Sequence, residues 1–182
     1  GMELFYGKAN CSSCHSGSLM TNQKFYSLGI PQFGPGRTRS FDPYARDVGR
    51  MVETDDLNDM YKFKTPALRN VTLTAPYGHN GAYPTLEGII KHHLDPKGMY
   101  KIWKPKLANL PKAGWLEDID FVTFSDKREQ ERIISSIEIR PIDLSDKEIF
   151  YLVEFLKSLT GKSGNNRPLG KPNKVPSGLL ID

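Results

Sequence analysis

The sequence predicts a mainly α-helical fold with long loops, and two well-marked helices carry that prediction. The helices start at Thr85 and Ser145, two hydroxyl residues suited to capping, and continue as apolar stripes with three- and four-residue spacing. The segments around them are rich in Gly, Pro, Asp and Asn, which favour turns and loops. A chain of 182 residues, 38% of them hydrophobic, can bury a core as one domain or as a domain with a long insertion.

Three segments precede the first of these helices. Residues 2–14 are expected to form a helix that runs into a cysteine motif, with Leu4, Phe5 and Ala9 as its apolar positions. Residues 16–62 are expected to be mostly irregular, and so long a loop in a compact domain is usually functional or wrapped around another group. Residues 63–84 are expected to be extended and rich in turns.

The helix that Thr85 caps carries two adjacent histidines. Its apolar stripe consists of Leu86, Ile89, Ile90 and His93. His92 points roughly 100° away from His93 around the helix, and we expect it to be solvated.

Residues 95–143 form a second polar stretch, in which we expect one short helix at "REQERIISSIEI". Its basic part, "KGMYKIWKPKLANLPK", is interpreted as a solvated loop punctuated by proline. Two alternatives stay open for this part: a nucleic-acid surface, because Lys residues alternate with Tyr100 and Trp103, and a docking surface for an acidic redox partner.

The last helix has the clearest boundaries. Ser145 and Glu148 predict a capping box, and Leu144 is placed to pack against Ile149 as a hydrophobic staple. The apolar stripe consists of Ile149, Leu152, Val153, Leu156 and Leu159, and Gly161 is expected to end the helix. Residues 162–182, rich in Pro, Gly, Asn and Lys, are expected to form an extended tail over the surface.

The overall composition excludes some classes of protein. The 25 Lys and Arg against 21 Asp and Glu give a mild net charge of +4, and the composition is that of an ordered globular protein. No apolar run approaches the ~20 residues of a membrane-spanning helix. The first residues, "GMELFYGKANC", do not have the pattern of a secretory leader, so we interpret the chain as mature or as an excised piece, and we favour the piece.

The motif "CSSCH" raises three chemical alternatives for Cys11, Cys14 and His15. A thiol redox pair needs only the spacing of the cysteines, but normally occurs in a βαβ context that this sequence lacks. A structural zinc site needs four ligands, and without further cysteines three histidines would have to complete it. Covalent haem attachment uses every residue of the motif, with two thiols for the vinyl groups and an imidazole for the iron, and is the favoured interpretation.

A covalently bound haem has two consequences for this chain. The porphyrin supplies apolar surface, which explains how a chain with so many loops keeps a core. Covalent haem attachment takes place outside the bacterial cytoplasm, so we expect a periplasmic or otherwise extracytoplasmic protein. The absence of further cysteines agrees with that compartment.

Three segments together resemble the bacterial di-haem cytochrome c peroxidases and MauG-like enzymes, and more narrowly their C-terminal haem domain. They are "LFYGKANCSSCHSG", "FKTPALRNVTLTAPYGHNGAYPTLEGIIKHH" and "LSDKEIFYLVEFLKSLTG". The resemblance implies a cytochrome c-like haem domain over residues 1–161, with an insertion at about 96–143 that lies outside it.

The resemblance also implies a division of labour. In this family the N-terminal haem reduces peroxide, and the C-terminal haem takes electrons from a donor and passes them on. This chain has one haem motif, so it corresponds to the electron-transfer half, and its own peroxidase activity is in doubt. The implied partners are a small cytochrome or copper protein as the donor and the missing peroxidatic domain. The alternative is a self-sufficient mono-haem peroxidase, or a ligand-sensing or structural haem domain.

The family also implies which residue ligates the other face of the iron. Peroxidases have a methionine and MauG-like enzymes a tyrosine at the position that aligns with His93. Imidazole is a good iron ligand, so His93 is the expected distal ligand and His15 the proximal one. The alternative from the residues alone is a methionine, as in simple cytochromes c, and the available methionines are Met51, Met60 and Met99.

Further site residues follow from the resemblance. His79 is expected to support the haem edge, with a turn-stabilising role as the alternative. Arg69 is a candidate partner for a haem propionate, with a surface salt bridge as the alternative. The backbone carbonyls of Thr74 and Pro76 correspond to family ligands of a calcium ion, whose other ligands belong to the missing domain.

Overall fold

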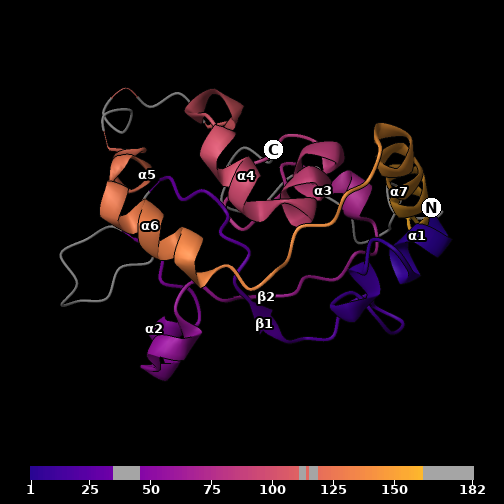
Figure 1. The fold of residues 1–182 in the computed structure, drawn as a ribbon, viewed down its shortest axis with the longest axis horizontal. Coiled ribbons are helices and arrows are strands. Elements are labelled where there is room, and N and C mark those ends of the chain that lie inside the picture. Colours follow the sequence, from indigo (N-terminus) through magenta and orange to yellow (C-terminus); the bar gives the residue numbers. More distant parts are fainter. Residues whose placement is uncertain (35–45, 111–113, 115–118, 162–182) are drawn as a thin grey trace, which may run out of the picture.

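The computed structural model describes residues 1–34, 46–110, 114 and 119–161, and this part of the chain is mainly helical (Figure 1). The helices are α1 (Met2–Tyr6), α2 (Met51–Thr54), α3 (Leu86–Leu94), α4 (Pro96–Ile102), α5 (Val122–Ser125), α6 (Lys127–Ser136) and α7 (Asp146–Ser158). Short 3-10 turns are η1 (Cys11–Ser13), η2 (Leu57–Asp59), η3 (Val71–Leu73) and η4 (Pro105–Leu107). Two short strands, β1 (Phe25–Tyr26) and β2 (Phe63–Lys64), pair antiparallel, with Phe25 opposite Lys64. This pairing joins a part of the long segment that was expected to be irregular to the residues just after that segment.

The two well-marked helices are confirmed. The Thr85 side chain accepts a hydrogen bond from the Gly88 N–H at the start of α3. Ser145 and Glu148 form the predicted capping box at the start of α7. The expected helix over residues 2–14 is shorter, because α1 ends at Tyr6 and the chain turns through a left-handed Asn10 before η1.

Three clusters of buried side chains make up the core. The first joins α1, α3 and α7 and consists of Phe5, Ala9, Met20, Leu86, Leu152 and Leu156. The second consists of Phe33, Ala82, Tyr83 and Trp103, and the third of Val48, Tyr61, Tyr100 and Ile133. In Figure 1, α1 and α7 lie at one end of the molecule and α2, α5 and α6 at the other, with α3 and α4 between them.

The interpretation of the basic stretch as a solvated loop is wrong for its first half. Residues 96–102 form α4, because Pro96 suits the first helical position and the Asp95 carboxylate accepts from the Gly98 N–H. Tyr100 and Trp103 are 3% and 4% exposed, and the Trp103 indole donates to the Ala82 carbonyl over 2.8 Å. The two aromatic residues therefore anchor this stretch in the core.

The short helix expected at "REQERIISSIEI" is confirmed as α6, with Asp126 accepting hydrogen bonds at its start. Ile133 of α6 is 1% exposed, so the predicted insertion is part of the core. The expected tail at 162–182 lies outside the described residues. Among the helices of the described ranges, none has both the length and the apolar character needed to cross a membrane.

Candidate functional site

The cysteine motif forms a tight turn at the edge of the first core cluster. Cys11 begins η1, and its carbonyl accepts from the N–H of Cys14 at 3.3 Å and of His15 at 2.9 Å. The two thiols are free and partly buried, and Cys11 packs against the first cluster. One turn of backbone therefore presents two thiols and an imidazole together.

The segment after His15 fixes the orientation of its ring. Gly17 has φ +73°, a left-handed conformation that favours glycine, and the turn it starts is closed by the Met20 N–H to the Gly17 carbonyl. The Met20 carbonyl lies 3.1 Å from His15 Nδ1. A carbonyl can only accept, so Nδ1 carries the proton and Nε2 is the nitrogen available to a metal.

His93 is held in the same way on α3. Its Nδ1 lies 2.8 Å from the carbonyl of Ile89, one turn earlier, so Nδ1–H donates and Nε2 is available. The rings of His15 and His93 lie with their centroids 6.4 Å apart and their planes at 55°. The motif turn and α3 thus bring together two imidazoles that are 78 residues apart in the sequence.

Both imidazoles are neutral at neutral pH. The pKa of His15 is lowered to about 4, mainly by burial and also by the nearby His93, and hydrogen bonds with the Met20 and Pro66 carbonyls oppose these effects. Burial also lowers the pKa of His93, opposed by its hydrogen bond to Ile89. Neutral imidazole is the form that binds metals.

The distance between the rings fits a single metal ion held between them. A bond from a transition metal to an imidazole nitrogen is about 2.0–2.1 Å long, so two such bonds and the two half-rings span roughly 6 Å. The observed centroid separation is 6.4 Å. With two free thiols beside His15, this chain has the side chains that a covalently attached haem requires.

The two competing interpretations of the motif find less support. A reactive dithiol needs a thiol whose pKa is lowered, whereas burial raises the pKa of Cys11 to about 11. A structural zinc site needs four ligands. No group of three or more His, Cys, Asp or Glu residues that could hold a metal ion occurs within residues 1–34, 46–110, 114 and 119–161.

The expectation that His92 is solvated is wrong. His92 is 0% exposed, with Nδ1 2.8 Å from the Tyr83 hydroxyl and Nε2 2.8 Å from the Leu28 carbonyl. Nε2–H must donate to the carbonyl, so Tyr83 donates to Nδ1, and both nitrogens are satisfied. His92 therefore ties α3 to two other segments and fixes the rotation of the helix that carries His93. The sequence contains no local signal for these distant partners.

The three methionines proposed as alternative ligands lie in other parts of the core. Met51 and Met60 pack against the third cluster, and Met99 packs against the second. The His93 ring, in contrast, lies with its centroid 6.4 Å from that of His15.

The other predicted site residues lie on the surface. His79 is exposed, with Nε2 2.8 Å from an Asp47 carboxylate oxygen and its ring 3.8 Å from that of Phe63. Arg69 is exposed and makes no ion pair with another described residue. Thr74 and Pro76 are exposed after η3. The structure does not bring these residues into contact with His15 or His93.

Comparisons with known proteins identify the family. Cytochrome-c peroxidase IdrP2 of Denitromonas iodatirespirans is 35% identical over 182 residues, covering 91% of this chain and 40% of the relative. Methylamine utilization protein MauG of Methylorubrum extorquens is 28% identical over 159 residues, covering 87% of this chain and 33% of the relative. The chain belongs to the cytochrome c peroxidase and MauG family. No protein-family model matches it.

Solved structures of the cytochrome c peroxidase and MauG family share the fold. A MauG-like protein associated with microbial copper homeostasis matches with a TM-score of 0.59 and 27% identity, covering 92% of this chain and 47% of that structure. The diheme peroxidase BthA from Burkholderia thailandensis matches with a TM-score of 0.53 and 21% identity, covering 88% of this chain and 41% of that structure. The chain spans less than half the length of these family members.

Proposed function

We propose that the chain is a c-type haem domain that relays electrons, with Cys11 and Cys14 attaching the haem and His15 and His93 binding its iron. The observation that carries the proposal is the 6.4 Å separation of two neutral imidazoles beside two free thiols. Attachment of the haem would need no oxidant, because each cysteine thiol adds across one vinyl group of the haem. Its sulfur bonds to one vinyl carbon and its hydrogen to the other. When bound, haem accepts and gives up one electron at a time.

The side chains around the site suit electron transfer better than catalysis. Each histidine donates its Nδ1–H to a backbone carbonyl, which fixes the ring and makes Nε2 a better ligand. If His15 and His93 both held the iron, no coordination position would be left for peroxide. Ile89 and Ile90 of α3 are partly buried and pack against the first core cluster, which Cys11 also contacts.

In this proposal the domain passes electrons from a donor, a small cytochrome or copper protein, to a peroxidatic haem on a part of the protein that this chain does not contain. The relatives support a second part of this kind, because each is more than twice as long as the part that matches this chain. The proposed compartment is the periplasm, where covalent haem attachment takes place. A propionate contact for Arg69, a haem-edge role for His79 and a calcium site at Thr74 and Pro76 stay predictions from the family.

Peroxide turnover tests this function. We expect negligible reduction of hydrogen peroxide by the isolated haem-bound domain with a reduced cytochrome as donor, because His15 and His93 would occupy both faces of the iron. His93→Ala is the matched control, since it opens one face and shows that the assay can detect peroxide reacting with the iron. Steady turnover by the unmodified domain at about 1 per second or more would instead identify a self-sufficient peroxidase.

A further inference from the structure

We propose that α4 carries a docking surface for an acidic redox protein. The surface consists of Lys97, Lys101, Lys104 and Arg140, and we call it the α4 cationic surface. The proposal rests on the electron-transfer function proposed above and adds to it the location and the charge of the partner.

The cations of this surface are exposed. None of the four makes an ion pair with another described residue. Other lysines of the described ranges are paired, for example Lys62 with Glu138 at 3.0 Å and Lys91 with Glu87 at 2.6 Å. The single acidic residue of the stretch 95–106 is Asp95, and its carboxylate is used by the Gly98 N–H. The positive charge is therefore available to a partner.

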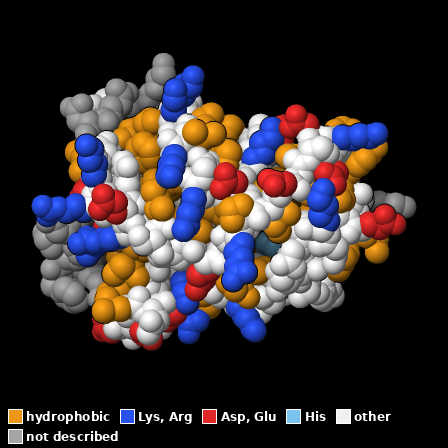
Figure 2. All heavy atoms as spheres, viewed as in Figure 1, with side chains coloured by type: hydrophobic (Ala, Val, Ile, Leu, Met, Phe, Trp, Pro, Cys, Tyr) orange, Lys and Arg blue, Asp and Glu red, His pale blue; other side chains and the backbone are white. Residues whose placement is uncertain are grey.

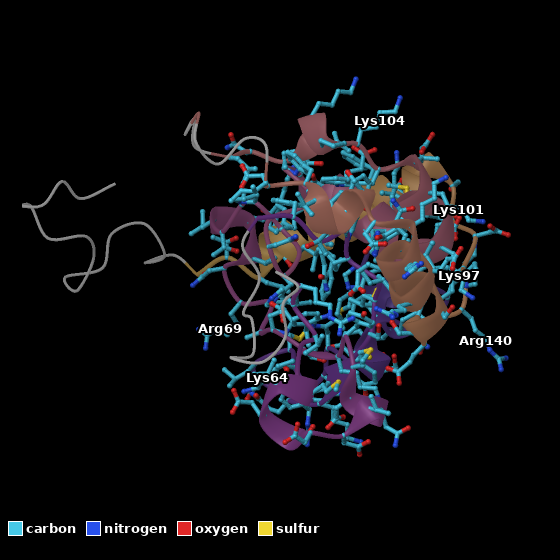
Figure 3. The ribbon with its side chains drawn as sticks, turned by 90° about the vertical axis from the view of Figure 1, so that its left-hand side faces the viewer. Lys64, Arg69, Lys97, Lys101, Lys104 and Arg140 are labelled. Carbon is cyan, nitrogen blue, oxygen red and sulfur yellow. The ribbon has the colours of Figure 1, made fainter. Side chains whose placement is uncertain are left out.

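The four cations come from two segments, and three of them, Lys97, Lys101 and Arg140, lie on the same side (Figure 3). Lys97 and Lys101 are one turn apart on α4, and Lys104 follows the end of the helix. Arg140 lies on the segment before α7. The N–H of Ile142 in this segment donates to the carbonyl of Leu94 over 2.8 Å, which holds the segment beside the start of α4. Figure 3 shows Lys97, Lys101 and Arg140 along one side of the molecule, with Lys64 and Arg69 on the opposite side. Figure 2 views that side face-on and shows Lys and Arg side chains distributed over it.

The burial pattern favours a protein over a nucleic acid or a membrane as the partner. A single-stranded nucleic acid stacks its bases on exposed aromatic side chains, but Tyr100 and Trp103 are buried. A membrane-bound helix needs a continuous exposed apolar face, and on α4 only Ile102, 66% exposed, is available. A few unpaired cations around a small apolar contact match the weak, electrostatically steered complexes of redox proteins.

The position of the surface connects it to the iron ligand. α4 follows α3 after the single residue Asp95, and the two helices pack against each other. α3 carries His93, so a protein docked on α4 lies next to the helix that holds the proposed distal ligand. Complementary charges there would raise the association rate while leaving the complex short-lived, as electron relay requires.

Electron transfer from reduced flavodoxin, a small and strongly acidic flavoprotein of low potential, tests the docking surface. The haem-bound domain and two double variants are mixed with it in a stopped-flow instrument at low ionic strength. Lys97→Glu with Lys101→Glu should slow the second-order rate by roughly 10-fold, because steering attraction becomes repulsion. The matched control, Lys24→Glu with Lys64→Glu, changes the net charge equally with two exposed lysines away from α4, and should stay within about 2-fold of the unmodified domain.

Reduction of the haem by a neutral flavin radical distinguishes a failure of this docking proposal from a failure of the proposed electron-transfer function. All variants should react with it at the same rate, and a domain that cannot be reduced by it contradicts the electron-transfer function itself. Raising the salt to about 0.5 M should bring the flavodoxin rates of all variants together, because the charges are then screened. Lys104→Glu with Arg140→Glu provides a second variant pair, with the same expected loss. If both α4 double variants and the control double variant react with flavodoxin at equal rates at low salt, the docking surface is overturned.

Discussion

Replacing His93 with alanine is expected to convert a six-coordinate, low-spin haem into one with an open iron face. The reason is geometric, since the His93 ring lies 6.4 Å from the His15 ring and has its Nδ1 held by the Ile89 carbonyl. The open face should take up water in the oxidised state and carbon monoxide in the reduced state. Optical spectra with and without carbon monoxide measure the change, which should go from no binding to full binding.

His93→Met is the matched control for that experiment. A thioether is also an iron ligand, so this variant should keep a low-spin haem and have a higher reduction potential than the unmodified domain. If His93→Ala leaves both the spectrum and the potential unchanged, the ligand is another residue. Met51 and Met60, the alternatives from the sequence, would then be the next variants to make.

Replacing Cys11 and Cys14 together with alanine is expected to abolish covalent haem attachment. The unmodified domain should keep its haem after denaturation and have a mass one haem above that of the polypeptide, because two thioether bonds hold the porphyrin. The double variant should have the mass of the polypeptide alone. Mass spectrometry of the denatured proteins measures this all-or-none difference.

Ser13→Ala serves as the control for the cysteine variant, since Ser13 lies between the two cysteines, is exposed and contributes no thiol. It should keep the full haem mass. Extraction of haem from the denatured unmodified domain into acidified organic solvent would contradict covalent attachment.

The helices that the sequence predicted correctly are those whose signals are local. Ser145 and Glu148 cap α7 through a hydrogen-bond pair within four residues, and Thr85 caps α3 in a similar way. The cysteine motif likewise depends on adjacent residues. Local patterns of this kind are visible without knowledge of the rest of the fold.

The errors arose where long-range packing decides the outcome. His92 appeared to be on the exposed side of its helix, but Tyr83 and the Leu28 carbonyl, 64 positions away from His92, satisfy both of its nitrogens inside the core. Trp103 appeared to be part of a solvated loop, but it stacks on Phe33 with ring centroids 5.5 Å apart. The polar composition around both residues concealed contacts with distant segments, which a periodicity within one segment cannot indicate.

The proximity of His15 and His93 could be anticipated only through the family alignment, since no rule of spacing joins two single histidines so far apart. That alignment predicted residue 93 as the position of the distal iron ligand. The histidine at this position, in place of methionine or tyrosine, predicted an imidazole as that ligand. The structure adds the ring separation and the backbone hydrogen bonds that leave both Nε2 atoms available.

The central claim is that His15 and His93 bind the two faces of one haem iron. Electron paramagnetic resonance of the oxidised, haem-bound domain, recorded together with its near-infrared absorption, tests it most directly. Two imidazole ligands predict a low-spin ferric signal without the charge-transfer band of a methionine–iron bond. A high-spin signal, or a low-spin signal accompanied by that methionine band, would contradict the claim.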